Sequence, residues 1–158
     1  ATNSKNLDSL LLITTRNFNS INSYLQEQNR ANLSVLLLTG GWLEAMHITC
    51  QVSAKDPSNK ELQEKIGEQK IILENIVLLL GYYKDVDQNM ASLLEDMKTL
   101  QQEYEKVEII KTYKESTFEI VDGVMVIKDN SSSEIKITDE NIDNIKNIVK
   151  SVRKKVIS

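Results

Sequence analysis

Apolar residues recur at alternating steps of three and four along most of this chain. This spacing keeps one face of a helix against its neighbours and is typical of helical bundles. Four segments before about residue 113 show it. Their apolar rows are Leu7, Leu11, Phe18, Ile21 and Leu25; Val35, Leu38, Trp42, Ala45 and Val52; Leu62, Ile66, Leu73, Ile76 and Leu80; and Val86, Met90, Leu93, Met97, Leu100, Tyr104 and Val107. The spacing predicts four helices that pack on one another.

Polar or turn-forming residues separate these four segments, at 28–32, 54–59 and 81–85. Connections this short force neighbouring helices to run antiparallel. We therefore predict a mainly α fold, in which residues 1–115 form an up-down-up-down antiparallel four-helix bundle.

The apolar period changes to two after about Tyr113. Two β-rich runs, Phe118-Glu-Ile-Val and Val124-Met-Val-Ile, flank Asp122-Gly123, a dipeptide typical of a tight hairpin turn, and a third alternating run begins at Glu134. A lone small sheet needs its apolar face covered. We predict that residues 116–158 form a small β-hairpin or meander and a C-terminal helix, packed on the bundle.

That last helix is indicated by a renewed helical period. Thr138 or Asp139 can cap its start. Its apolar row is Ile142, Ile145, Val149, Val152 and Val156. We expect this helix or the end of the bundle to cover the apolar face of the meander.

Charge and residue counts exclude several classes of function. The chain carries 19 basic and 23 acidic residues, a net charge of −4, so no overall positive field attracts nucleic acid. A single cysteine and a single histidine exclude an internal disulfide and a structural zinc site within one chain. No uninterrupted run of about eighteen apolar residues predicts a membrane-spanning helix.

Candidate chemistry is concentrated in the second predicted helix. Glu44 and His47 have the Glu-x-x-His spacing of di-iron helical bundles, but such a site needs two of these pairs and two further glutamates. His47 and Cys50 lie one turn apart, yet a catalytic thiol also needs an orienting group and an electropositive setting. We predict no metal site, no cofactor and no catalytic residue.

Gly40-Gly41 lies in the middle of the same helix, where each glycine costs about 1 kcal/mol relative to alanine. Close approach of another backbone, with Trp42 filling the core beside it, is the preferred interpretation. A helix kink with a small ligand cavity is the alternative. A phosphate-binding loop lacks its longer glycine spacing and its Lys-Ser/Thr.

Basic residues gather in the last helix: Lys146, Lys150, Arg153, Lys154 and Lys155. Positive charge is favoured at a helix C-terminus, so a solvated face is the simplest interpretation. A membrane surface or an acidic partner is the functional alternative.

Six segments carry a resemblance to known proteins: Gly40-Gly-Trp-Leu-Glu-Ala-Met-His, Asn59-Lys-Glu-Leu, Ile66-Gly-Glu-Gln-Lys-Ile-Ile-Leu-Glu-Asn, Asp122-Gly-Val, Ile135-Lys-Ile-Thr-Asp-Glu and Ser151-Val-Arg-Lys-Lys-Val. They resemble a family of uncharacterised Gram-negative bacterial proteins predicted to be cell-envelope lipoproteins. The resemblance implies a lipidated cysteine upstream of Ala1 and a periplasmic or membrane-anchored location. It implies no activity, cofactor or site residue.

These observations favour a non-catalytic interaction or structural module of the cell envelope. An unidentified protein is the expected partner, and a membrane would be reached only through the upstream anchor. The alternative is a small-molecule-binding or metal-dependent helical bundle that uses the Gly40-Gly41 kink or the Glu44 and His47 pair.

Overall fold

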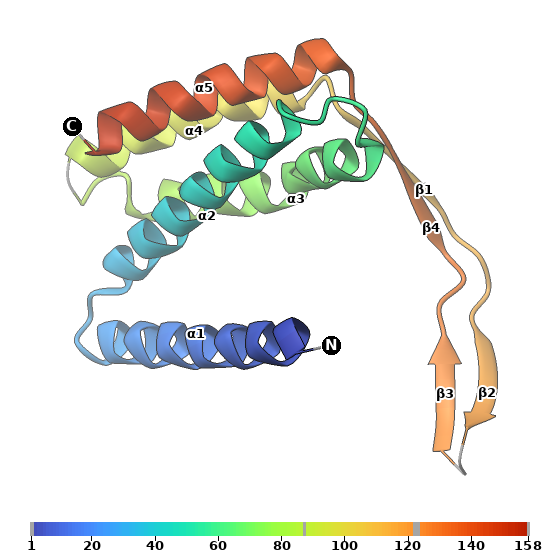
Figure 1. Cartoon of the computed structure of the whole chain (residues 1–158). Helices are drawn as coiled ribbons and strands as arrows, with labels where there is room; N and C mark the ends of the chain where they lie inside the picture. The colour runs from blue at the N-terminus through green and yellow to red at the C-terminus, as the bar shows by residue number, and fades with distance from the viewer. Residues whose placement is uncertain (1, 87, 122–123, 158) are drawn as a thin grey trace.

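The computed structural model describes residues 2–86, 88–121 and 124–157. These residues form a body of helices, from which the strands between Glu108 and Lys136 project as a long, two-stranded β arm (Figure 1). The elements in chain order are α1 (Thr2–Glu27), α2 (Ala31–Ser53), α3 (Lys60–Tyr83), α4 (Gln88–Tyr104), β1 (Glu108–Thr112), β2 (Thr117–Val121), β3 (Val124–Lys128), β4 (Ser132–Lys136) and α5 (Asp139–Ile157). The prediction of a mainly helical chain with a small antiparallel strand region and a final helix is confirmed.

Four helices, α2 to α5, form the body. α3 and α5 each lie against both α2 and α4. α5 buries the apolar row Ile142, Ile145, Val149 and Val152 in the shared core. The group of four differs from the predicted one, because α5 takes the position expected for the first helix.

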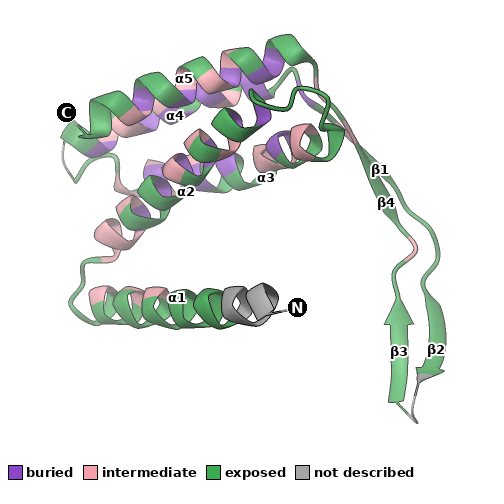
Figure 2. Ribbon diagram, viewed as in Figure 1, coloured by how far each residue is buried: buried purple, intermediate pink, exposed green. Residues whose placement is uncertain are grey.

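α1 lies apart from this body, and its main contact is with α2, the next helix in the chain. Phe18 and Leu25 are half-buried beside α2, whereas Leu11 and Ile21 of the same predicted row are exposed. Most of α1 is exposed in Figure 2. Its periodicity correctly predicts a helix, but the four-helix core does not include it.

The buried faces of the other helices follow the predicted rows to different extents. On α3, Ile66, Leu73, Ile76 and Leu80 are buried as predicted. On α4, Leu100 is buried as predicted, whereas Leu94 is buried in place of the predicted Leu93, which is only partly buried. On α2 the buried face is rotated from the predicted one. It consists of Val35, Thr39, Trp42, Leu43, Met46, Cys50 and Ser53.

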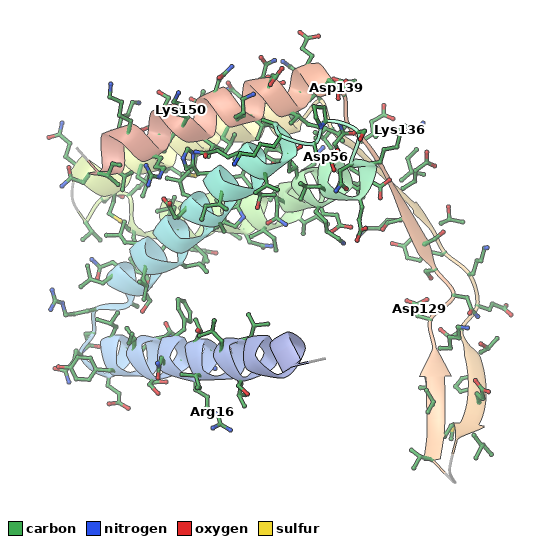
Figure 3. All side chains as sticks on the ribbon, viewed as in Figure 1. Arg16, Asp56, Asp129, Lys136, Asp139 and Lys150 are labelled. Carbon is green, nitrogen blue, oxygen red and sulfur yellow. The ribbon has the colours of Figure 1, made fainter. Side chains whose placement is uncertain are left out.

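The strands form one arm built from two short sheets. β1 pairs with β4 and β2 pairs with β3, both antiparallel. Asp129 lies at the break between the two sheets (Figure 3) and accepts a hydrogen bond from the Ser131 N–H. The predicted hairpin of β2 and β3 is confirmed, and its Asp122-Gly123 turn lies outside the described residues. β1 was not predicted, and β4 pairs with it rather than with β3.

The base of the arm is fixed to α3 by close packing. A side chain on Gly67 of α3 would collide with Ile135 of β4, and Val107 lies beside the same spot. Glycine at this position therefore allows the arm to lie directly on the helix. The backbone N–H of Asn141 donates to the Thr138 hydroxyl, and the Thr138 N–H donates to the Asn141 side-chain oxygen, both at 3.2 Å. This reciprocal cap starts α5 at the residue that the sequence predicts.

Candidate functional site

Glu44 and His47, the predicted Glu-x-x-His pair, are each engaged by another side chain. Oε2 of Glu44 accepts from Arg153 Nε at 2.5 Å, and Oε1 accepts from Nη2 at 3.1 Å. The hydrogen bond from Arg153 holds the pKa of Glu44 below its usual range. Nε2 of His47 lies 2.6 Å from the amide nitrogen of Gln51. Glu44 therefore links α2 to α5, and His47 contacts a residue of its own helix, α2. Glu44 faces the Arg153 guanidinium and not an open coordination site.

Cys50 is 1% exposed, within the core between α2 and its neighbours. Burial raises the pKa of its thiol to about 11. The thiol is therefore protonated at neutral pH, whereas a nucleophilic cysteine needs a thiolate in an accessible place. Cys50 acts here as a small core side chain.

Gly40 and Gly41 are exposed on α2, which is helical without interruption from Ala31 to Ser53. Among the described residues, no atom lies within 4 Å of where either Cβ would be. The expected close approach of another backbone is therefore wrong. A hollow of about 300 Å³ between α1, α2 and α3 is lined by Phe18, Leu38 and Leu79 among others, and neither glycine contributes to it.

Basic residues of α5 are largely matched by acids. Lys146 pairs with Asp143 on the same helix, and Arg153 and Lys155 reach Glu44 of α2 and Asp96 of α4. These contacts anchor α5 to two neighbouring helices. The interpretation as a helix face with its own ion pairs accounts for them without a ligand.

A polar network that the apolar pattern does not reveal joins α4 to α5. Glu103 is buried and accepts hydrogen bonds from Lys106, Asn141 and Asn144. Burial raises the pKa of Glu103, but these three donors outweigh it, so the pKa lies below its ordinary value. All its partners are supplied by the chain. The network is a structural contact, because three donors hold the Glu103 carboxylate in place and offset the cost of burying its charge.

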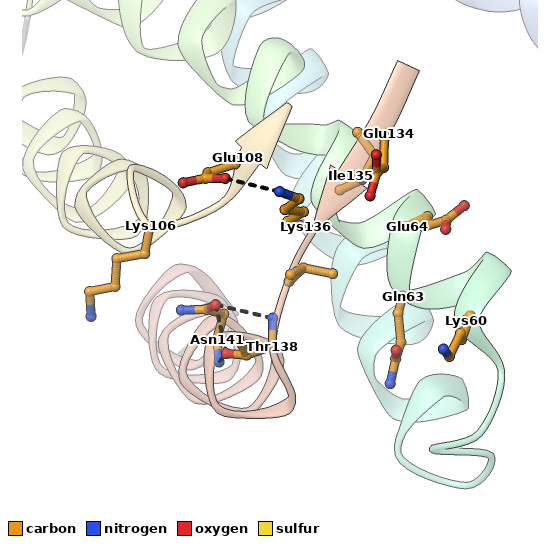
Figure 4. Close-up of a pocket in the computed structure, with 11 residues that line it drawn as sticks. Lys60, Gln63, Glu64, Lys106, Glu108, Glu134, Ile135, Lys136, Thr138 and Asn141 are labelled. Carbon is orange, nitrogen blue, oxygen red and sulfur yellow. Dashed lines mark hydrogen bonds and ion pairs between the residues drawn. The ribbon is translucent and has the colours of Figure 1, made fainter. Parts of the chain in front are cut away.

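The largest hollow is an open groove of about 550 Å³ at the base of the arm (Figure 4). Three lysines and three glutamates line it: Lys60, Lys106, Lys136, Glu64, Glu108 and Glu134. Lys136 lies 3.9 Å from Glu108 across the two strands. The equal numbers of opposite charges select neither an anion nor a cation.

Candidate metal or catalytic clusters are not found among the described residues. No three His, Cys, Asp or Glu side chains there are grouped so as to hold a metal ion. The one buried side-chain oxygen without a partner in this part of the chain is the Ser34 hydroxyl.

The arm carries an exposed apolar surface. In the register of β2 and β3, Phe118 lies opposite Ile127 and Ile120 lies opposite Met125. Because cross-strand partners share a face, these four side chains form one apolar face of the sheet. They are between 64% and 76% exposed. The expected covering of this sheet by the bundle or the last helix is wrong for β2 and β3, since both strands lie in the exposed arm of Figure 2.

α2 is long and apolar enough to cross a bilayer by length and composition alone, with a mean hydropathy of 1.3. Core helices of soluble proteins and signal sequences meet the same criterion. α2 contacts α3 and α5, and 28% of its apolar window is buried. The predicted absence of an uninterrupted run of about eighteen apolar residues is a stricter criterion, so by length and composition α2 is one candidate span among the described residues.

No protein-family model matches the chain, and no curated protein or solved structure matches it.

Proposed function

We propose that the chain is a non-catalytic interaction module of the bacterial cell envelope and that it binds a protein partner through its arm. The observation that carries the proposal is the apolar face formed by Phe118, Ile120, Met125 and Ile127. Exposed apolar patches on a projecting element mark interaction sites. The envelope location rests on the resemblance of the sequence to predicted envelope lipoproteins.

The arm is built to present this face away from the body. Its base is fixed on α3 by the contact of Ile135 with Gly67, while β2 and β3 have no strong contact with any helix. Halfway along, the Asn130 side chain donates to the Glu115 carbonyl and the Thr117 hydroxyl, at 2.8 and 3.2 Å. These hydrogen bonds join the two sides of the arm at the break between the β1–β4 sheet and the β2–β3 sheet. The arm is therefore fixed at its base, and its outer sheet of β2 and β3 is uncovered.

Capture from detergent-solubilised envelope fractions tests the proposal. Ile120→Glu places a charge on the apolar face, and Thr112→Glu places the same charge on the exposed end of β1, in the same arm but outside that face. We expect Ile120→Glu to weaken capture about tenfold or more, because a buried charge without a partner is costly. Thr112→Glu should capture like the unaltered chain. Equal capture by all three chains, or none by any, would contradict the proposal.

A further inference from the structure

β3 is an edge strand with the sequence of a central strand. It pairs with β2 on one side, and no other described strand lies on its other side. Its sequence is Val-Met-Val-Ile-Lys, so four successive residues are apolar and both faces are hydrophobic. Such unbroken apolar runs are typical of strands with neighbours on both sides and both faces covered. All five residues are exposed here.

β2, the other strand of this sheet, has the features of a true edge. It alternates polar and apolar residues and places Glu119 at its centre. Charged residues on an edge strand prevent another strand from pairing with it. In β3 the only charge is Lys128 at the end of the strand. The two edges of the sheet therefore differ: the edge at β2 is protected, and the edge at β3 is open.

We propose that the open edge of β3 pairs with β3 of a second copy of this chain, antiparallel and centred on Val126. This inference deepens the proposed function, because it doubles the apolar face on which that function rests. The pairing places Val126 opposite the second copy's Val126 and Met125 opposite its Ile127. It produces a four-stranded sheet with the order β2, β3, β3, β2.

Charge favours this register over the alternative self-pairing. At the β3 edge, no two like charges lie opposite each other, since Lys128 falls opposite Val124. At the β2 edge, self-pairing would place Glu119 opposite Glu119, and like charges directly opposite are destabilising. The β1 and β4 edges carry Glu108, Lys111, Glu134 and Lys136. Among the described strands, only β3 offers an edge without a charge in its interior.

The same pairing also explains why assembly would stop at two copies. Two-stranded sheets are marginal in water, and three or more strands are needed for independent stability. Pairing the β3 edges gives four strands, and both outer edges are then β2 with its Glu119. An isologous contact of this kind is closed, so no filament grows from it. The antiparallel direction places the two helical bodies at opposite ends of the joined arms.

Sedimentation across a concentration series, with charged substitutions at Val126, tests the inference. Val126→Lys faces itself in the proposed register and lies opposite Glu119 within its own hairpin, so the hairpin is retained. A Glu119→Lys/Val126→Glu double variant reverses both charges. Each variant alone should dimerise about tenfold more weakly or worse than the unaltered chain, because like charges meet at the centre. An equal mixture of the two should form a mixed dimer.

Thr112→Glu is the control, since it adds a charge to β1, in the same arm but away from the open β3 edge, and it should dimerise like the unaltered chain. Circular dichroism should show the same helical melt for all variants, because the arm lies outside the core. A chain that stays monomeric, variants that still dimerise alone, or a mixture that does not associate would overturn the inference. A monomer whose envelope capture still depends on Ile120 would leave the proposed function standing. A dimer that captures nothing would reject the proposed function alone.

Discussion

Glu44 of α2 and Arg153 of α5 form a two-point ion pair between residues 109 positions apart in the chain. Glu44 was considered above as a metal ligand, and Arg153 belongs to the basic face of the last helix. Their contact accounts for the acidic residue on α2 and for one basic residue on α5 without a ligand. It also lies where α5 is held in the body by Ile145, Val149 and Val152. The last helix is therefore part of the core and not an appendage to it.

Removal of α5 should unfold the body. A chain ending at Tyr113 loses the four buried apolar side chains of α5 and exposes the faces of α2 and α4 that they cover. The predicted division at residue 115 expects the opposite, a cooperative helical melt of the shortened chain. Circular dichroism and thermal melts separate the two outcomes. A melt like that of the full chain would mean that α5 contributes little to stability.

The two glycine positions that the structure distinguishes should respond oppositely to alanine. Gly41→Ala should stabilise the fold by about 0.5–1 kcal/mol, because the helix is continuous and the space around the new Cβ is open. Gly67→Ala should destabilise it, because the new methyl group collides with Ile135. Chemical denaturation of both variants measures the difference. A destabilised Gly41→Ala chain would show that something covers α2 at this position.

Leucine truncations should report the observed faces of α3 and α4. Leu73→Ala should cost about 2–5 kcal/mol in the free energy of unfolding, since Leu73 is fully buried. Leu93→Ala should cost about 1 kcal/mol, because Leu93 is only partly buried and Leu94 faces the core instead. Urea denaturation provides both values. A larger loss at Leu93 than at Leu73 would contradict the register of these helices.

The Glu103 network should make stability depend on acid pH. The pKa of Glu103 is lower in the folded state than its ordinary value of about 4.3, so ionised Glu103 stabilises the fold above that pH. This stabilisation is lost as pH falls through the lower folded pKa. Glu103→Gln should cost about 1–3 kcal/mol at pH 7 and progressively less below pH 4. Glu105→Gln, at an exposed position beside it, is the control and should show neither effect.

Cys50 should be unreactive in the folded protein. Its burial and a pKa of about 11 mean that the accessible thiolate is scarce at pH 8. Iodoacetamide should label the native chain only at the rate at which it unfolds, and should label it fully in denaturant. Rapid labelling of the native chain, measured by mass spectrometry, would place Cys50 at the surface.

Periodicity predicts which residues of a helix are buried better than it predicts what buries them. The row of α3 is correct except for its first residue, Leu62, which is only partly buried, and the row of α5 is correct except for its last, Val156, which is exposed. Any apolar neighbour produces the same spacing. The row of α1 is equally regular, yet Leu11 and Ile21 are exposed. Which of two amphipathic helices enters a bundle depends on contacts between distant segments. The spacing of apolar residues within one segment does not reveal those contacts.

The polar contacts and the arm were harder to predict for the same reason. Glu103 lies within the apolar row of α4, and its partners Asn141 and Asn144 follow about forty residues later. β1 continues the apolar pattern after α4, so it was not distinguished from the end of that helix, and its partner β4 follows after the whole of β2 and β3. The hairpin of β2 and β3 was predicted because its pairing is local. Its exposed apolar face could only be seen once the position of the body was known.

The most direct test of the account is a chain whose arm is shortened at the pair Thr112 and Ser132. These residues lie opposite each other in β1 and β4, so an Asn-Gly turn can replace residues 113–131. We expect this chain to keep the helical content and cooperative melt of the full chain and to capture no partner from envelope fractions. An unfolded product would show that the arm belongs to the core. Undiminished capture by a folded product would show that the arm is not the interaction surface.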